Sequence, residues 1–225
     1  QKAAPKLCPV TLELGGKNPN IIMSDADLDI AIPGVIDGMR YTRQGQACTA
    51  GSRVYIQEKI YEKVLEGVVN KLKNLKMGNA LDENSDIGAI ISKEQLDRTL
   101  HYMNIAKENS STKVLHGGNQ KKEGDYKDGF FYEPTLLSGV PVESPVCQEE
   151  IFGPVACAIP FKSFDEVLKS ANNTPFGLSA VLWTQNLSRA LQFVEEIEAG
   201  FVQVNQCVAP RANVSYGGLK MSGLG

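Results

Sequence analysis

The last third of the chain alternates between apolar runs and amphipathic segments, and this alternation limits the folds open to it. Ser163 and Glu166 form a capping box that begins one helix, and a second helix is predicted from about Ser188. Strands that are joined through helices by short links run parallel, with right-handed crossovers. The sequence therefore predicts the α/β class, a mainly parallel sheet covered by helices on both faces. The predicted strands of this part are 155–161, 178–184 and 201–205.

The rest of the chain adds further strands and helices, and we find no reason to divide it, so residues 1–225 are predicted to form one domain. Ser24 is the expected N-cap of a helix because acidic residues follow it, and Pro33 is expected to kink that helix. Residues 119–129 are polar and glycine-rich, which is typical of an exposed loop. The other predicted strands are 9–14, 20–23, 53–57 and a short one within 112–118, and the other helices are 24–41, 58–76 and 93–108.

Composition excludes several classes of protein. The net charge is −3 with the two signs interspersed, so we expect neither a nucleic-acid partner nor binding to a membrane surface. No apolar stretch is long enough to span a bilayer, and the first residues do not resemble a signal peptide. The five cysteines are widely spaced and form no C-x-x-C pair, so we expect no disulfide framework, no metal site and a cytoplasmic, reducing location.

Cys48 is the cysteine whose surroundings favour chemistry. It lies in the run QGQACTAGS, where small neighbours let a ligand approach and backbone N–H groups can stabilise a thiolate or an oxyanion. The alternative is an ordinary buried cysteine, an interpretation that fits Cys8 and Cys157 better because both lie in apolar runs. Cys147 and Cys207 lie in predicted loops and stay open.

Glu13 ends an apolar run just before a Gly-Gly break. Ligands bind at the carboxyl ends of strands in α/β sheets, so a partly desolvated carboxylate there suits a general base. An ion pair with Lys17, or a solvated strand end, explains the same residue slightly better. Glu149 and Glu150 head the run EEIFGPV, where one acid can accept hydrogen bonds from ribose hydroxyls or both can simply face solvent.

Seven runs occur in an order that resembles the aldehyde dehydrogenase superfamily along nearly the whole chain: LELGGKNPNIIMSDADLD, GQACTAGSR, MGNALDENSDIGAIIS, EEIFGPV, NTPFGLSA, VQVNQ and YGGLKMSGLG. The resemblance implies an oxidoreductase with Cys48 as catalytic cysteine and Glu13 as the base for deacylation. It implies that Glu150 holds the nicotinamide ribose and that Phe152 lies beside the nicotinamide. It also implies that Gly15 and Gly16 let the cofactor and the substrate pass close to the backbone. Asn205 is implied to have a structural role behind the catalytic loop.

The resemblance also implies a reaction. A thiohemiacetal forms on Cys48, NAD or NADP (NAD is favoured) takes the hydride, and water hydrolyses the thioester intermediate to a carboxylic acid. Glu13 favours hydrolysis over transfer to coenzyme A, because members that acylate coenzyme A typically lack this base. A coenzyme-A-acylating dehydrogenase and a non-catalytic protein of the same fold are the alternatives.

The resemblance implies that the substrate is a small-molecule aldehyde and that Tyr216, Arg211 and Cys207 line its pocket. Arg211 can pair with a carboxylate of a semialdehyde, although a solvent-facing arginine explains it better. The resemblance also implies that the intact protein is a homo-oligomer, a homodimer or a homotetramer. We expect the chain to be a catalytic-domain fragment that lacks most of the cofactor-binding domain and the C-terminal oligomerisation strand. Alone, it should therefore bind NAD weakly and be weakly active or inactive.

Overall fold

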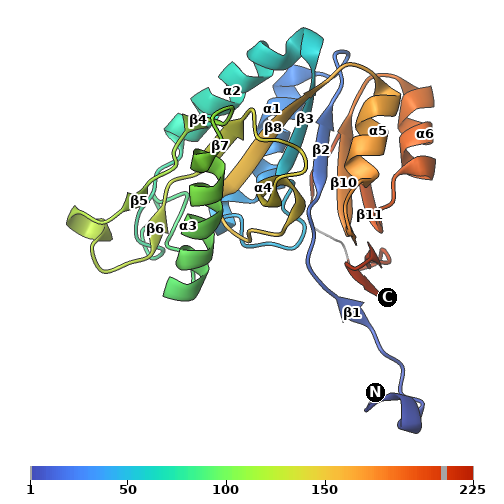
Figure 1. Ribbon diagram of the computed structural model, residues 1–225, viewed down its shortest axis with the longest axis horizontal. Helices are drawn as coiled ribbons and strands as arrows, with labels where there is room; N and C mark the ends of the chain where they lie inside the picture. The colour runs from blue at the N-terminus through green and yellow to red at the C-terminus, as the bar shows by residue number, and fades with distance from the viewer. Residues whose placement is uncertain (1, 209–211, 225) are drawn as a thin grey trace.

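A seven-stranded sheet forms the centre of the molecule. The computed structural model describes residues 2–208 and 212–224 (Figure 1). Neighbouring strands run parallel except for the antiparallel pair at one edge, β4 and β7, so the prediction of a mainly parallel sheet is confirmed. In spatial order the strands are β11 (Phe201–Val204), β10 (Ser179–Trp183), β2 (Pro19–Ile22), β3 (Arg53–Gln57), β8 (Val155–Phe161), β7 (Thr135–Ser138) and β4 (Lys113–His116).

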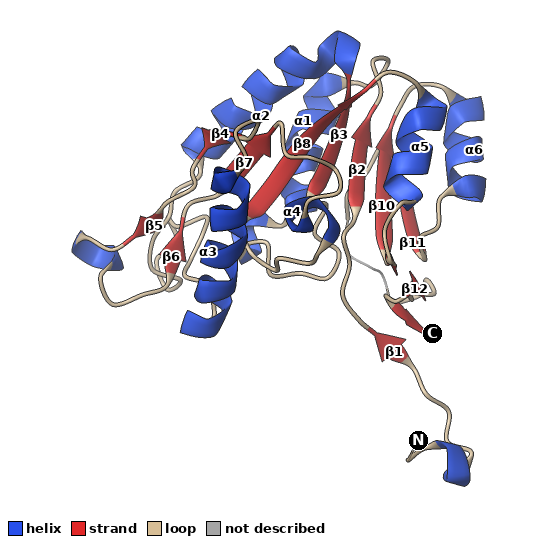
Figure 2. Ribbon diagram, in the orientation of Figure 1, coloured by secondary structure: helices blue, strands red, loops and turns tan. Residues whose placement is uncertain are grey.

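Helices cover both faces of this sheet (Figure 2). Side chains that follow one another along a strand point to opposite faces, so Ile21 packs in one apolar cluster and Ile22 in the other. Because both faces bury apolar side chains, strands such as β8 and β10 are almost entirely apolar. One cluster is closed by α1 (Leu28–Met39) and α2 (Tyr61–Asn74), and the other by α3 (Lys93–Glu108), α4 (Pro145–Gln148), α5 (Phe164–Asn172) and α6 (Leu187–Glu196).

Helix beginnings follow the side-chain caps. The predicted capping box of Ser163 and Glu166 is present at the start of α5. The prediction for Ser24 is wrong: the side chain of Asp27 caps α1 by accepting a hydrogen bond from Asp29 N at 3.0 Å. Serine and aspartate are equally good caps, so local sequence could not separate the two. Pro33 lies inside α1, which continues past it to Met39.

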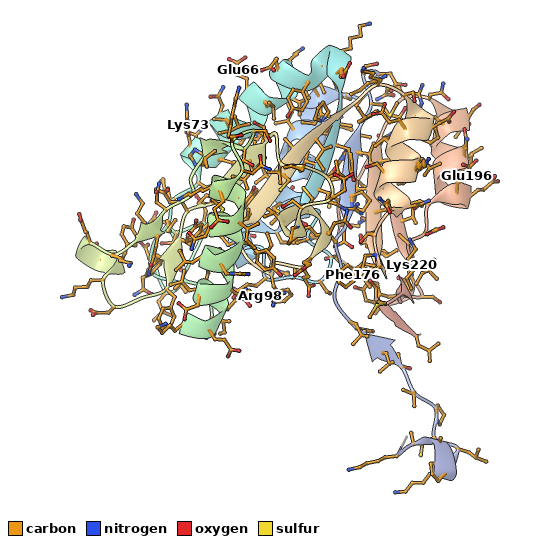
Figure 3. The ribbon with its side chains drawn as sticks, viewed as in Figure 1. Glu66, Lys73, Arg98, Phe176, Glu196 and Lys220 are labelled. Atoms are coloured by element: carbon orange, nitrogen blue, oxygen red, sulfur yellow. The ribbon has the colours of Figure 1, made fainter. Side chains whose placement is uncertain are left out.

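Several short elements lie outside the large sheet. The predicted strand 9–14 is reduced to a two-residue strand that extends away from the body (Figures 1 and 2). The predicted exposed loop 119–129 contains one short strand and one turn of helix. Phe176 and Lys220, labelled in Figure 3, are register partners in a further ribbon. The paired strands are β1 (Leu12–Glu13) with β13 (Gly223–Leu224), β9 (Phe176–Gly177) with β12 (Leu219–Lys220), and β5 (Gln120–Lys121) with β6 (Phe131–Tyr132); the 3₁₀ turns are η1 (Ala4–Lys6), η2 (Tyr41–Arg43), η3 (Glu58–Ile60) and η4 (Gly124–Tyr126).

Within residues 2–208 and 212–224, no helix has both the length and the apolar character required to cross a membrane.

Arg53 fastens three elements together at the start of β3. Its side chain is fully buried and donates to Lys17 O at 2.8 Å and to Ala171 O at 2.9 Å. A further N–H points to Ser170 O at 3.3 Å. The guanidinium therefore supplies donors to the segment before β2 and to the end of α5, which no other residue type could do at once.

We predict that Arg53→Lys lowers the free energy of unfolding by about 3 kcal/mol, because buried carbonyl oxygens lose their donors. The control is Arg189→Lys, at a half-exposed ion pair with Asp25 of 3.0 Å. That change should cost less than about 1 kcal/mol. Urea denaturation of both variants measures the difference, and equal losses would contradict the anchoring role of Arg53.

Candidate active site

The candidate site residues gather at the amino ends of the sheet strands. Residues 15–17 precede β2, residues 46–51 precede β3, and residues 150–153 precede β8. The expectation that Glu13 ends a strand of the parallel sheet at its carboxyl edge is wrong. Glu13 lies in β1, which pairs with β13 outside the large sheet, and the chain enters the sheet only after Gly15 and Gly16.

Cys48 lies half-buried in a tight loop of small residues, as the sequence predicts. Ala50 N donates to Ala47 O at 3.0 Å, and Gly51 N donates to Gly38 O at 2.8 Å. Among the residues that the structure describes, the backbone N–H of Cys48 has no hydrogen-bond acceptor. The loop therefore presents a partly accessible thiol together with an uncommitted backbone donor.

Asn18 holds this loop in place. Its Nδ2 donates to Cys48 O at 2.7 Å and to Ala50 O at 2.9 Å. Its Oδ1 accepts from Ser179 N at 2.9 Å, so one buried amide joins the starts of β2, β3 and β10. The sequence analysis missed Asn18, although a polar residue at the start of a buried strand was a usable signal. Asn205, expected behind the loop, instead bonds Thr184 N at 3.0 Å and Thr184 O at 2.8 Å.

Gly15 and Gly16 pack where side chains would not fit. A Cβ on Gly16 would lie 2.6 Å from Cys48 O, and a Cβ on Gly15 would lie 2.5 Å from Glu150 Oε2. Gly16 N donates to Glu150 Oε1 at 3.0 Å. The two glycines therefore bring the cysteine loop and a carboxylate against one segment of backbone.

The turn that carries Glu150 and Phe152 is fixed to α3. Gln95 Nε2 donates to Phe152 O at 2.8 Å, and Arg98 donates to Glu150 O at 3.2 Å through Nε. Arg98 lies toward the lower end of α3 in Figure 3. Tyr102 OH donates to Glu149 Oε2 at 2.6 Å, which holds the first acid away from the second. Gly16, Ala47, Glu150 and Phe152 line one small pocket.

Glu13 is exposed, so the expectation of a partly desolvated carboxylate is wrong for this chain. Leu12 on the same strand is also exposed. Ser222 attaches this segment: its backbone oxygen accepts from Leu14 N at 2.9 Å, and its Oγ donates to Gly15 O at 2.6 Å. The alternative ion pair with Lys17 is also absent from the described residues, because Lys17 is buried. Burial lowers the pKa of Lys17.

Tyr216 lies directly beside the thiol of Cys48. Its hydroxyl lies 3.6 Å from Cys48 Sγ, and its ring meets Phe201 edge-on at 5.6 Å between ring centres. The pKa of Tyr216 is raised, first by burial, next by the hydrogen bond with Cys48, and then by the negative charges of Cys48 and Glu13. The phenol therefore contacts the predicted nucleophile.

The other cysteines differ in their surroundings. Cys157 is buried in mid-strand as predicted, and Cys147 is buried as well. Cys8 is exposed, so its predicted burial is wrong: the apolar run that contains it lies on the extended arm and not in the core. Cys207 is half-buried beside α1, where burial raises its pKa. Arg211 lies outside the described residues, and residues 2–208 and 212–224 contain no cluster of three potential metal ligands.

A cysteine loop held against a Gly-Gly segment at the edge of a parallel sheet defines an α/β protein with an enzyme-like site. The model of the Aldehyde dehydrogenase family matches residues 1–225, and the chain belongs to this family. It is 41% identical over 212 residues to alpha-ketoglutaric semialdehyde dehydrogenase of Bacillus subtilis strain 168, with 94% of this chain and 43% of the relative covered. It is 40% identical to betaine aldehyde dehydrogenase of Vibrio vulnificus strain YJ016, with 99% and 46% covered.

A solved structure agrees with the fold. The NAD+ complex of an aldehyde dehydrogenase from Bacillus cereus superposes with a TM-score of 0.93 at 40% identity, with 100% of this chain and 44% of that chain covered. The chain thus spans less than half the length of the relatives it matches. Both curated relatives are named as dehydrogenases of aldehydes.

We predict that Asn18→Ala destabilises the protein by about 3 kcal/mol, because two carbonyl oxygens and one N–H lose their partner. The ratio of alkylation of Cys48 to alkylation of exposed Cys8 should also fall, because the loop loses its anchor. Asn205→Gly is the control, since glycine tolerates the positive φ of 52° there. Urea denaturation and peptide mass spectrometry measure both effects. An unchanged Cys48 to Cys8 ratio in Asn18→Ala would contradict the prediction.

Proposed function

We propose that this chain carries the acyl-transfer chemistry of an NAD-dependent aldehyde dehydrogenase that oxidises a small aldehyde to a carboxylic acid. The observation that carries the proposal is the contact between the Cys48 loop and the segment after Glu13. Gly16 packs against Cys48 O while its N–H donates to Glu150. The proposed nucleophile and the proposed ribose ligand therefore contact the same residue, Gly16, which follows the proposed base Glu13 in the chain.

In the first half of the proposed reaction, the Cys48 thiolate attacks the aldehyde carbon. A C–S bond forms, and the carbonyl electron pair moves onto oxygen. The uncommitted N–H of Cys48 is suited to donate to this oxyanion. When bound, the nicotinamide supplies the hydride acceptor that turns the adduct into a thioester.

In the second half, Glu13 removes a proton from a water molecule. That water attacks the thioester carbon, the C–S bond breaks, and Cys48 leaves as a thiolate with the acid as product. Exposure of Glu13 keeps the carboxylate within reach of water.

Two residues beside the Cys48 loop have the chemistry to hold part of a dinucleotide. The carboxylate of Glu150 would accept hydrogen bonds from ribose hydroxyls, and the ring of Phe152 would lie beside the nicotinamide. Both residues lie next to Gly16, whose backbone packs against Cys48 O. NAD is favoured over NADP because the Bacillus cereus neighbour is an NAD+ complex. A homodimer or homotetramer in the cytoplasm remains our proposal for the intact protein.

The names of the relatives do not identify one aldehyde substrate. One is named for a semialdehyde, which bears one carboxylate, and another for betaine aldehyde, which is a cation. Arg211 would suit the first, and with Tyr216 and Cys207 it remains a proposed pocket residue.

The reaction product distinguishes the proposed hydrolytic enzyme from the coenzyme-A-acylating alternative. With coenzyme A present, the full-length enzyme should still release free acid, because Glu13 activates water. Chromatography that finds acyl-coenzyme A as the main product would favour the alternative.

We predict that mild iodoacetamide labels Cys48 about ten times faster than Cys8 near neutral pH, because the thiolate is the reactive form and an uncommitted backbone N–H and the Tyr216 hydroxyl are available to stabilise it at Cys48. Buried Cys147 and Cys157 should react last. Peptide mass spectrometry over a time course gives the rates. Equal rates at Cys48 and Cys8 would favour a non-catalytic protein of this fold.

We predict that Glu13→Gln in the full-length enzyme slows steady-state turnover by about 100-fold or more while a first burst of reduced cofactor remains. The reason is that hydride transfer does not use the carboxylate, whereas thioester hydrolysis does. Stopped-flow absorbance measures the burst, and intact-protein mass spectrometry detects the acyl adduct. Loss of the burst together with turnover would contradict the role of Glu13 as a deacylation base.

A further inference from the structure

The hydroxyl of Tyr216 and the sulfur of Cys48 form a pair that the proposed reaction has not used. The two atoms lie 3.6 Å apart, and both side chains are half-buried. With a neutral thiol, either atom can donate the hydrogen bond. A thiolate has no proton, so it can only accept, and the phenol must then be the donor.

Tyr216 is well suited to remain that donor. Burial, the contact with Cys48 and the negative charge of Glu13 all raise the pKa of Tyr216. The phenol therefore keeps its proton throughout the range in which a cysteine ionises. The proton of Cys48 leaves to solvent, and the proton of Tyr216 stays in the shared hydrogen bond.

We propose that Tyr216 is a further catalytic residue, whose hydroxyl donates a hydrogen bond to the Cys48 thiolate and holds the sulfur ionised and in place before attack. The proposal rests on the proposed role of Cys48 as nucleophile. It assigns a specific role to the hydroxyl oxygen of Tyr216, in addition to the proposed role of this residue in the substrate pocket.

The charged groups near this pair are acidic. The charge of Glu13 on β1 contributes to the raised pKa of Tyr216. Glu150, across Gly16, accepts a hydrogen bond from Gly16 N. Among the described residues, no lysine or arginine side chain hydrogen bonds to the Cys48 sulfur. The Tyr216 hydroxyl is thus the side-chain donor that the structure offers to the thiolate.

The hydrogen bond has two opposite effects on reactivity. It raises the fraction of thiolate at a given pH, and it lowers the nucleophilicity of each thiolate because the charge is stabilised. As the C–S bond forms, the sulfur loses its charge and becomes a weaker acceptor. A role limited to packing would produce neither effect.

Tyr216→Phe separates the hydroxyl from the ring. The edge-on contact with Phe201, at 5.6 Å between ring centres, does not involve the oxygen and should persist. The experiment measures the rate of Cys48 alkylation by iodoacetamide against pH, by peptide mass spectrometry. We expect the midpoint of the profile to rise by about one pH unit, and the limiting rate at high pH to rise about threefold.

Tyr126→Phe is the matched control. It removes a phenol that donates to Met77 O at 3.0 Å on the loop beside β6, so the Cys48 profile should not change. Cys8 gives an internal reference in every sample. Ultraviolet absorbance of the thiolate provides a second titration, and near-ultraviolet circular dichroism checks that the variant is folded.

The outcomes distinguish the two proposals. If Cys48 reacts faster than Cys8 and the profile of a folded Tyr216→Phe superimposes on that of the unsubstituted protein, the role of Tyr216 is overturned and the nucleophile stands. If Cys48 reacts no faster than Cys8 in the unsubstituted protein, the nucleophile and the role of Tyr216 both fail. A raised midpoint with a faster limiting rate supports both.

Discussion

The arrangement of the site depends on one buried amide. Asn18 donates to Cys48 O and Ala50 O and accepts from Ser179 N, so a single side chain fixes the starts of three neighbouring strands. If the loop moved, the buried amide of Asn18 would lose several hydrogen bonds at once. Other positions of the loop are therefore higher in free energy. The position of the thiol thus follows from hydrogen bonds between the Asn18 side chain and the backbone of the loop.

The site forms at the amino edge of the sheet because polar backbone and small residues accumulate there. Open α/β sheets commonly bind ligands at the carboxyl edge, beyond the ends of the strands. Here, Gly15 and Gly16 enter β2, the small-residue loop enters β3, and the turn with Glu150 enters β8. Three entering segments can pack this closely only where Gly16 has no Cβ to meet Cys48 O. The result is a pocket lined by backbone and by a few polar side chains.

The sequence predicted what local patterns determine. Strands 53–57 and 155–161 and helix 93–108 were found with their observed bounds, because burial on both faces and regular spacing are visible in a short window. The ribbons of β1 with β13 and β9 with β12 were not, since two-residue strands take their partners from far along the chain. The same reasoning explains the site. Cys48 and Glu150 stand out in unusual loops, whereas Asn18 and Ser222 act by meeting backbone groups that only the assembled sheet brings near.

The two halves of the proposed chemistry rest on different physical supports. The thiol lies in a loop that buried hydrogen bonds hold to the sheet, and Tyr216 closes over it. The carboxylate of Glu13 lies on an exposed ribbon, flanked by exposed Leu12 and Leu14. We expect a change on this ribbon to alter the surroundings of the proposed base while Asn18 still holds the loop of the sulfur. In the proposed reaction, attack on the aldehyde uses the sulfur and hydrolysis uses the carboxylate, so the first step depends on the sheet and the second on access to water.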